Sequence, residues 1–225
     1  MISAMRATCF VAALFVFPGL TAADEKCPAA QPQVEVETVH GEVEEFTDTT
    51  VAELAAAAKR HNAPLRHPIV GVYISTIAIG LDIKDKIVDL DANRRCSIPE
   101  AIYVRLGLTN RAVHLPRDFA DNPCLMEVAR SHQHRHADAD RALVNDIVAK
   151  YTEQLRARIA TLQIDPASSE QEARRRMTEA ARNLVREQLD SYEDMKQHVN
   201  QRVDTPEVVR IRSACGGTLS KQGGQ

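Results

Sequence analysis

The spacing of apolar residues divides the chain into a first half that favours strands and a second half that favours helices. Between residues 69 and 116, β-branched side chains cluster or alternate with polar ones, as in half-buried strands, and residues 89–93 have the composition of a turn. A shorter β-favouring run carries Val34, Val36 and Val39. The simplest arrangement of residues 69–116 is an antiparallel meander of three or four strands.

Helix signals mark two further segments. The Thr50/Glu53 capping box predicts a short helix over residues 50–60. Asn122 and Pro123 fit the cap and the first position of a long helix, which Asp165-Pro166 breaks. The apolar stripe of this long helix comprises Leu125, Val128, Ala129, Ala139, Leu143, Ile147, Tyr151, Leu155 and Ile159.

A second capping box, Ser169/Glu172, predicts another helix that follows after only a few residues. Its apolar face carries Met177, Ala181, Leu184, Tyr192, Met195 and Val199. A short connection makes the two helices an antiparallel hairpin. Thr205-Pro206-Glu207 predicts a last short helix that ends at Cys215-Gly216. The expected fold is therefore α+β: a small antiparallel sheet packed on a long helical hairpin.

The N-terminus has the three parts of a cleavable secretory signal over residues 1–23. Arg6 supplies the positive charge, a short apolar run follows, and small residues precede a cleavage site near Ala23. The apolar run is too short to span a bilayer comfortably. We expect a periplasmic or secreted protein without stable membrane insertion. A flexible lead over 24–32, a single domain over 33–218 and a disordered tail over 219–225 complete the predicted organisation.

Four cysteines remain after removal of the signal: Cys27, Cys96, Cys124 and Cys215. An even number in an oxidising compartment predicts two disulfides. Spacing does not decide among the three connectivities, and we favour Cys27–Cys96 with Cys124–Cys215. Loss of the signal changes the formal net charge from −3 to −4. This acidic balance and the absence of Trp argue against a nucleic-acid partner and leave an envelope protein or peptide as the expected partner.

The chemistry of the chain concentrates in the long helix, at His132 and His136. Residues four apart lie about 40° apart around a helix, one turn above the other, so both imidazoles can bind one zinc ion. In the metallopeptidase motif HExxH the residue after the first His is the Glu that acts as general base. Gln133 occupies that position here. A carboxamide cannot take a proton at neutral pH, so peptidase activity should be impaired.

A zinc site needs a third ligand, and the predicted hairpin suggests where it lies. Antiparallel pairing brings residues near 193–199 opposite His136, which makes Glu193 and His198 the candidates. Asp140 shares the face of the two histidines but lies about 12 Å from His132 along the axis, too far to bind the same ion. We assign Asp140 to the orientation of His136. The alternative is that the two histidines only pack in the core.

These residues resemble a family of uncharacterised exported bacterial proteins described as predicted secreted zinc-dependent proteases. The features held in common are Cys124 eight residues before His132, Asp140 four residues after His136, and an Asp204-Thr-Pro-Glu segment followed by Cys215-Gly. The resemblance covers residues 65–218 and implies a zincin-like fold with His132 and His136 as zinc ligands. Gln133 departs from the family motif.

The leading hypothesis is an exported zincin-like protein with a retained or vestigial zinc site and impaired peptidase activity. Such a protein would act in binding or scaffolding in the cell envelope. The alternatives are an active zinc-dependent hydrolase that uses another base and a metal-free structural periplasmic protein. The oligomeric state stays open.

Overall fold

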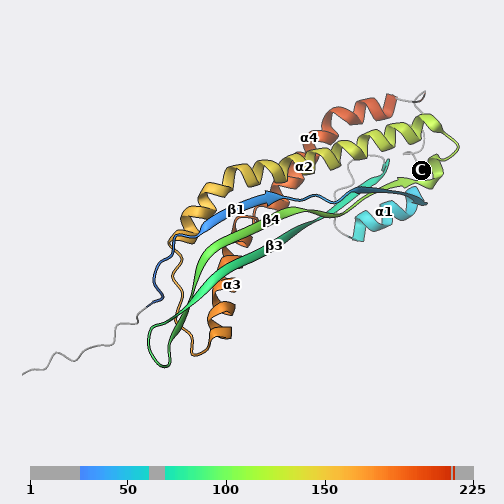
Figure 1. Ribbon diagram of the computed structural model, residues 1–225. Helices are drawn as coiled ribbons and strands as arrows, with labels where there is room; N and C mark the ends of the chain where they lie inside the picture. Colours follow the sequence, from blue (N-terminus) through green and yellow to red (C-terminus); the bar gives the residue numbers. More distant parts are fainter. Residues whose placement is uncertain (1–25, 61–68, 214, 216–225) are drawn as a thin grey trace, which may run out of the picture.

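The computed structural model describes residues 26–60, 69–213 and 215 (Figure 1). The predicted signal peptide and tail lie outside the described residues. The elements in chain order are β1 (Gln33–Thr38), β2 (Val43–Thr49), α1 (Val51–Arg60), β3 (Val72–Asp89), β4 (Arg95–Pro116), the 3₁₀ turn η1 (Arg117–Phe119), α2 (Pro123–Ala160), α3 (Glu170–Glu187) and α4 (Tyr192–Ser213).

β3 and β4 form one long antiparallel hairpin in place of several short strands. The turn falls where the sequence predicts it, and the Asp91 carboxylate accepts a hydrogen bond from the Asn93 amide at 2.8 Å. Two register shifts, after Ile74 and after Lys84, let the ladder continue along both strands. The glycines at 80 and 107 do not end a strand here, although such residues weaken one.

The other two strands pair with β4 in parallel, along its second edge. Val34 of β1 is opposite Ile102, and Val43 of β2 is opposite Arg111. The chain between β1 and β2 passes so close to Gly107 that a Cβ there would lie 1.6 Å from the Val39 carbonyl oxygen. The predicted antiparallel sheet is therefore wrong, because two of the three strand pairings among the described residues, β1 with β4 and β2 with β4, are parallel. Alternation of side chains identifies a strand but does not choose its partner or direction.

α2 packs on one face of this sheet and runs antiparallel to β4 (Figure 1). The end of α2 contributes Leu155 and Ile159 to a cluster with Ile102 and Val104 near the start of β4, and its beginning packs Leu125 and Ala129 on Val113 and Leu115 near the end. α3 adds Leu184 and Val185 to the first cluster. The predicted cap of α2 is confirmed, since the Asn122 side chain accepts from the Leu125 amide at 3.1 Å.

The predicted second helix is divided by a turn over residues 188–191 into α3 and α4. α3 belongs to the layer on the sheet, whereas α4 turns away and packs along α2 (Figure 1). α4 also continues through Pro206 to Ser213, so the prediction of a separate short helix from Thr205 is wrong. α2 and α4 thus form an antiparallel helix pair.

Two disulfides close the fold, with the connectivity that we favoured. Cys27–Cys96 is buried in a cluster with Ile164 and Met177. Cys124–Cys215 joins the first turn of α2 to the residues after α4, and Cys124 is exposed. Both bridges are consistent with an oxidising, extracytoplasmic location. No helix among the described residues is both long enough and apolar enough to cross a bilayer.

Candidate metal centre

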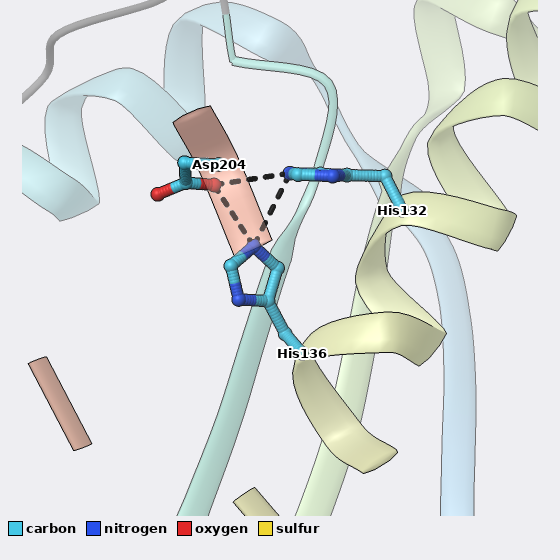
Figure 2. A group of neighbouring side chains, drawn as sticks. All are labelled: His132, His136 and Asp204. Atoms are coloured by element: carbon cyan, nitrogen blue, oxygen red, sulfur yellow. Dashed lines mark hydrogen bonds and ion pairs between the residues drawn. The ribbon is translucent and has the colours of Figure 1, made fainter. Parts of the chain in front are cut away.

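Two imidazoles and one carboxylate converge between α2 and α4 (Figure 2). The Nε2 atoms of His132 and His136 lie 3.2 Å apart. The Asp204 Oδ1 atom lies 3.0 Å from Nε2 of His136 and 3.4 Å from Nε2 of His132. His132 and His136 come from consecutive turns of α2, and Asp204 reaches them from α4, so the group forms only when the two helices pack.

These distances fit a shared metal ion. Ligand atoms about 2.0–2.1 Å from a tetrahedral zinc ion lie roughly 3.3 Å from one another, and imidazole nitrogen and carboxylate oxygen are donors that zinc accepts. The side chains of His132 and His136 are 8% and 11% exposed, while that of Asp204 is 39% exposed. The group can therefore hold an ion that is shielded by α2 and reachable from the side of Asp204.

The two histidines differ at their second ring nitrogen. Nδ1 of His136 lies 2.9 Å from the Asn200 side-chain oxygen, which can only accept a hydrogen bond. This contact places the proton of neutral His136 on Nδ1 and leaves the Nε2 lone pair directed at the group. Nδ1 of His132 is buried and has no hydrogen-bond partner among the described residues. Only His136 is thus oriented by a second residue.

Asp204 is held in its ionised form. Burial alone would raise the pKa of this carboxyl, but hydrogen bonds and charge from His132 and His136 outweigh burial and hold the pKa well below its usual range. A carboxylate that is ionised at neutral pH is ready to bind a cation without first losing a proton.

The third member of the group differs from the candidates named from the sequence. Glu193 and His198 are exposed residues of α4 and are not in the group, whose ligand atoms all lie within 4.8 Å of one another. The difference follows from the turn over 188–191, which starts α4 at Tyr192 opposite Asp140 and brings Asp204 opposite His136. The sequence does contain a signal for this face of α4, because polar residues recur at every fourth position: Tyr192, Lys196, Asn200 and Asp204.

Asp140 lies one turn beyond His136 but contacts different residues. Its carboxylate accepts hydrogen bonds from Ser75 at 2.5 Å and from Tyr192 at 2.6 Å, and Lys196 lies 3.4 Å away. Burial, together with the hydrogen bond to Asp140, raises the pKa of Tyr192 far above its usual value, so Tyr192 remains a donor. The predicted contact of Asp140 with His136 is not among the described hydrogen bonds, and Asp140 instead joins β3, α2 and α4.

Polar residues thus face one another in two antiparallel series along the helix pair. His132, His136 and Asp140 follow at four-residue steps on α2, opposite the series already noted on α4. His132 contacts Asp204, and His136 contacts Asp204 and Asn200. Asp140 contacts Lys196 and Tyr192. Since the contacts repeat at every turn, this polar seam fixes the register of α4 and with it the position of Asp204.

Gln133 is buried against the start of β3. A Cβ at Gly71 would lie 2.9 Å from Cγ of Gln133, and Gly71 has a φ of 151°, so only glycine suits this position. The other acidic residues near the motif on α2 point elsewhere: Glu127 bonds Arg130, and Asp138 bonds Arg141. His134 is half-buried, and its Nε2 atom lies 2.7 Å from the Glu45 carboxylate. None of these side chains belongs to the group.

No protein-family model matches the chain, and searches of curated proteins and of solved structures gave no significant match. The resemblance to exported zincin-like proteins is therefore not supported by a family match, and the structure shows a His132/His136/Asp204 group between α2 and α4 that could hold a metal ion. The arrangement could hold a cation.

Proposed function

We propose that this chain is an exported zinc-binding protein with little or no peptidase turnover, in which His132, His136 and Asp204 hold the ion. The observation that carries the proposal is the convergence of two Nε2 atoms and one carboxylate oxygen at 3.0–3.4 Å. Zinc in proteins is most often bound by nitrogen, oxygen and sulfur donors in this geometry. The role that fits such a site is binding or scaffolding in the cell envelope, with a peptide or protein as partner.

Impaired turnover follows from the residue beside the first ligand. Bound zinc would supply Lewis acidity and a more acidic water, but a general base must still take a proton during peptide hydrolysis. Gln133 can donate and accept hydrogen bonds without taking that proton. The loss of a general base typically lowers a rate by about 10² to 10⁴. The binding capacity of the site does not depend on this base.

Metal analysis of the purified mature protein tests the site itself. We expect zinc at near-unit stoichiometry and a titratable site after removal of the metal. Loss of a residue that only hydrogen-bonds a metal ligand typically weakens binding by roughly 10- to 100-fold. His132→Ala and Asp204→Ala each remove a ligand itself and should weaken zinc binding by more than that. His134→Ala is the matched control on the same helix, and Glu193→Ala and His198→Ala test the ligands named from the sequence. Absence of zinc binding by the unmodified protein would refute the proposal.

Placing a carboxylate at position 133 tests whether Gln133 is the reason for low peptidase activity. Gln133→Glu in the zinc-loaded protein should raise hydrolysis of a mixed peptide library, because a proton acceptor then stands next to His132. His132→Ala/Gln133→Glu is the control and should show no gain. A natural protein that already cleaves as fast as Gln133→Glu would instead be an active hydrolase with another base, the second candidate.

A further inference from the structure

We propose that the metal ion and the Cys124–Cys215 disulfide are coupled crosslinks, so that reduction of this disulfide weakens metal binding and bound metal protects the disulfide. The inference rests on the proposed metal site and names its regulation. It concerns one of the two disulfides only.

Both crosslinks join the same two helices. Cys124 lies in the first turn of α2, eight residues before His132, and Cys215 follows the end of α4, eleven residues after Asp204. The ion would bridge α2 and α4 through His132, His136 and Asp204, and the disulfide bridges them nearer to the helix ends. Forming either crosslink therefore lowers the conformational entropy that is lost when the other one forms.

The last turns of α4 contain a feature that weakens the helix, so crosslinks to α2 matter there. Pro206 lies inside the helix, two residues after Asp204, and cannot donate the backbone hydrogen bond of its turn. A proline in a helix interior removes one backbone hydrogen bond and destabilises the helix. Among the described side chains, the seam contacts of α4 extend from Tyr192 to Asp204, and the Cys124–Cys215 disulfide adds a covalent link to α2 just after the helix.

The two disulfides differ in access to a reductant. Cys27 and Cys96 are 9% and 0% exposed, within a cluster of apolar side chains. Cys124 is exposed at the end of the helix pair, and Cys215 is half-buried. Thiol–disulfide exchange requires that the attacking thiolate reach a sulfur, so a dithiol should reduce Cys124–Cys215 first.

The reaction balances with a dithiol as the reductant. The sulfur–sulfur bond between Cys124 and Cys215 breaks and both residues become thiols, while the two thiols of the reductant form a disulfide. Two electrons and two protons pass from the reductant to the protein. After this step no covalent link near the end of α4 supports the polar seam that holds Asp204 on the histidines. Linkage requires the reciprocal effect, a disulfide that is harder to reduce when metal is bound.

Zinc affinity of the full mature chain tests the first half of the coupling. The double variant Cys124→Ser/Cys215→Ser should bind zinc about 5- to 150-fold more weakly than the unmodified protein, the usual range of coupling between two sites. Cys27→Ser/Cys96→Ser is the matched control and should keep its affinity. Equal affinity of Cys124→Ser/Cys215→Ser and the unmodified protein overturns the coupling, whereas absence of zinc binding by the unmodified protein overturns the proposed function as well.

A protection assay on the unmodified protein tests the second half and does not require that a cysteine variant fold. The oxidised protein is treated with a limiting dithiol with and without zinc, and the free thiols are alkylated and identified by peptide mass. Zinc should slow the appearance of free Cys124 and Cys215 but not of Cys27 and Cys96. The protection should vanish in Asp204→Asn, which controls for binding of zinc by the dithiol. Equal rates with and without zinc refute the coupling.

Discussion

At the scale of single residues, the two histidines of the site are not equivalent. His136 has a partner at each ring nitrogen, Asn200 at Nδ1 and the metal-binding group at Nε2. His132 has the group at Nε2, but its Nδ1 is buried without a hydrogen-bond partner among the described residues. The orientation of the donor set therefore depends on Asn200 more than on any neighbour of His132.

Replacing Asn200 with Ala should weaken zinc binding by about 10- to 100-fold, because the second nitrogen of His136 loses the acceptor that fixes its tautomer and ring orientation. Calorimetric titration of the metal-free variant with zinc measures this change. Gln197→Ala, at an exposed position on the same helix, is the control. An unaltered zinc affinity in Asn200→Ala would show that the His136 ring is held by packing instead.

At the scale of helices and strands, local signals predicted where α1, α2 and α3 begin, and non-local pairing decided the arrangement of the elements. The caps Asn122 and Ser169 are confirmed, each accepting from a backbone amide three residues on. His132 and His136 could be paired from sequence because both lie on one helix. Asp204 belongs to the four-residue series on α4, but the series could be matched to the histidines only once the turn at 188–191 and the packing of α4 are known. No local signal predicts that β1 and β2 each pair with β4 in parallel. The acidic composition of β2 also gives no indication of a strand.

The seam between α2 and α4 should depend strongly on Asp140. Asp140→Ala removes the acceptor of Tyr192 and leaves the Lys196 ammonium, only 16% exposed, without its carboxylate. Removing one partner of a buried ion pair costs about 3–5 kcal/mol. Urea unfolding of the metal-free protein should show a loss of this size. Asp138→Ala is the control, since its carboxylate is exposed and pairs with exposed Arg141, and it should change the unfolding free energy by less than about 0.5 kcal/mol. A comparable loss in both variants would contradict the assigned role.

At the scale of the whole molecule, the two disulfides lie near opposite ends of β4. Cys96 is the second residue of that strand, and Cys215, the disulfide partner of Cys124, packs against the cluster of Leu115 and Leu125 at its other end. Around Cys27–Cys96, backbone bonds join Cys27 to Ile164 at 2.9 Å and Arg95 to Ala167 at 2.8 Å in both directions. This end of the molecule is therefore fixed by covalent, backbone and apolar contacts that the metal centre does not share.

Because of this separation, loss of the Cys27–Cys96 disulfide should lower the stability of the protein without changing its zinc affinity. Cys27 and Cys96 are 69 residues apart, and a loop of that length contributes about 4 kcal/mol in the chain-entropy account of disulfides. Cys27→Ser/Cys96→Ser should therefore lower the free energy of unfolding by about this amount, measured with urea, and leave the zinc affinity of the folded protein unchanged. Sites without shared contacts behave additively, so zinc should stabilise this variant and the unmodified protein equally. A smaller stabilisation by zinc in the variant would mean that strain at the start of β4 reaches the helix pair, and the two ends of the molecule would then form one cooperative unit.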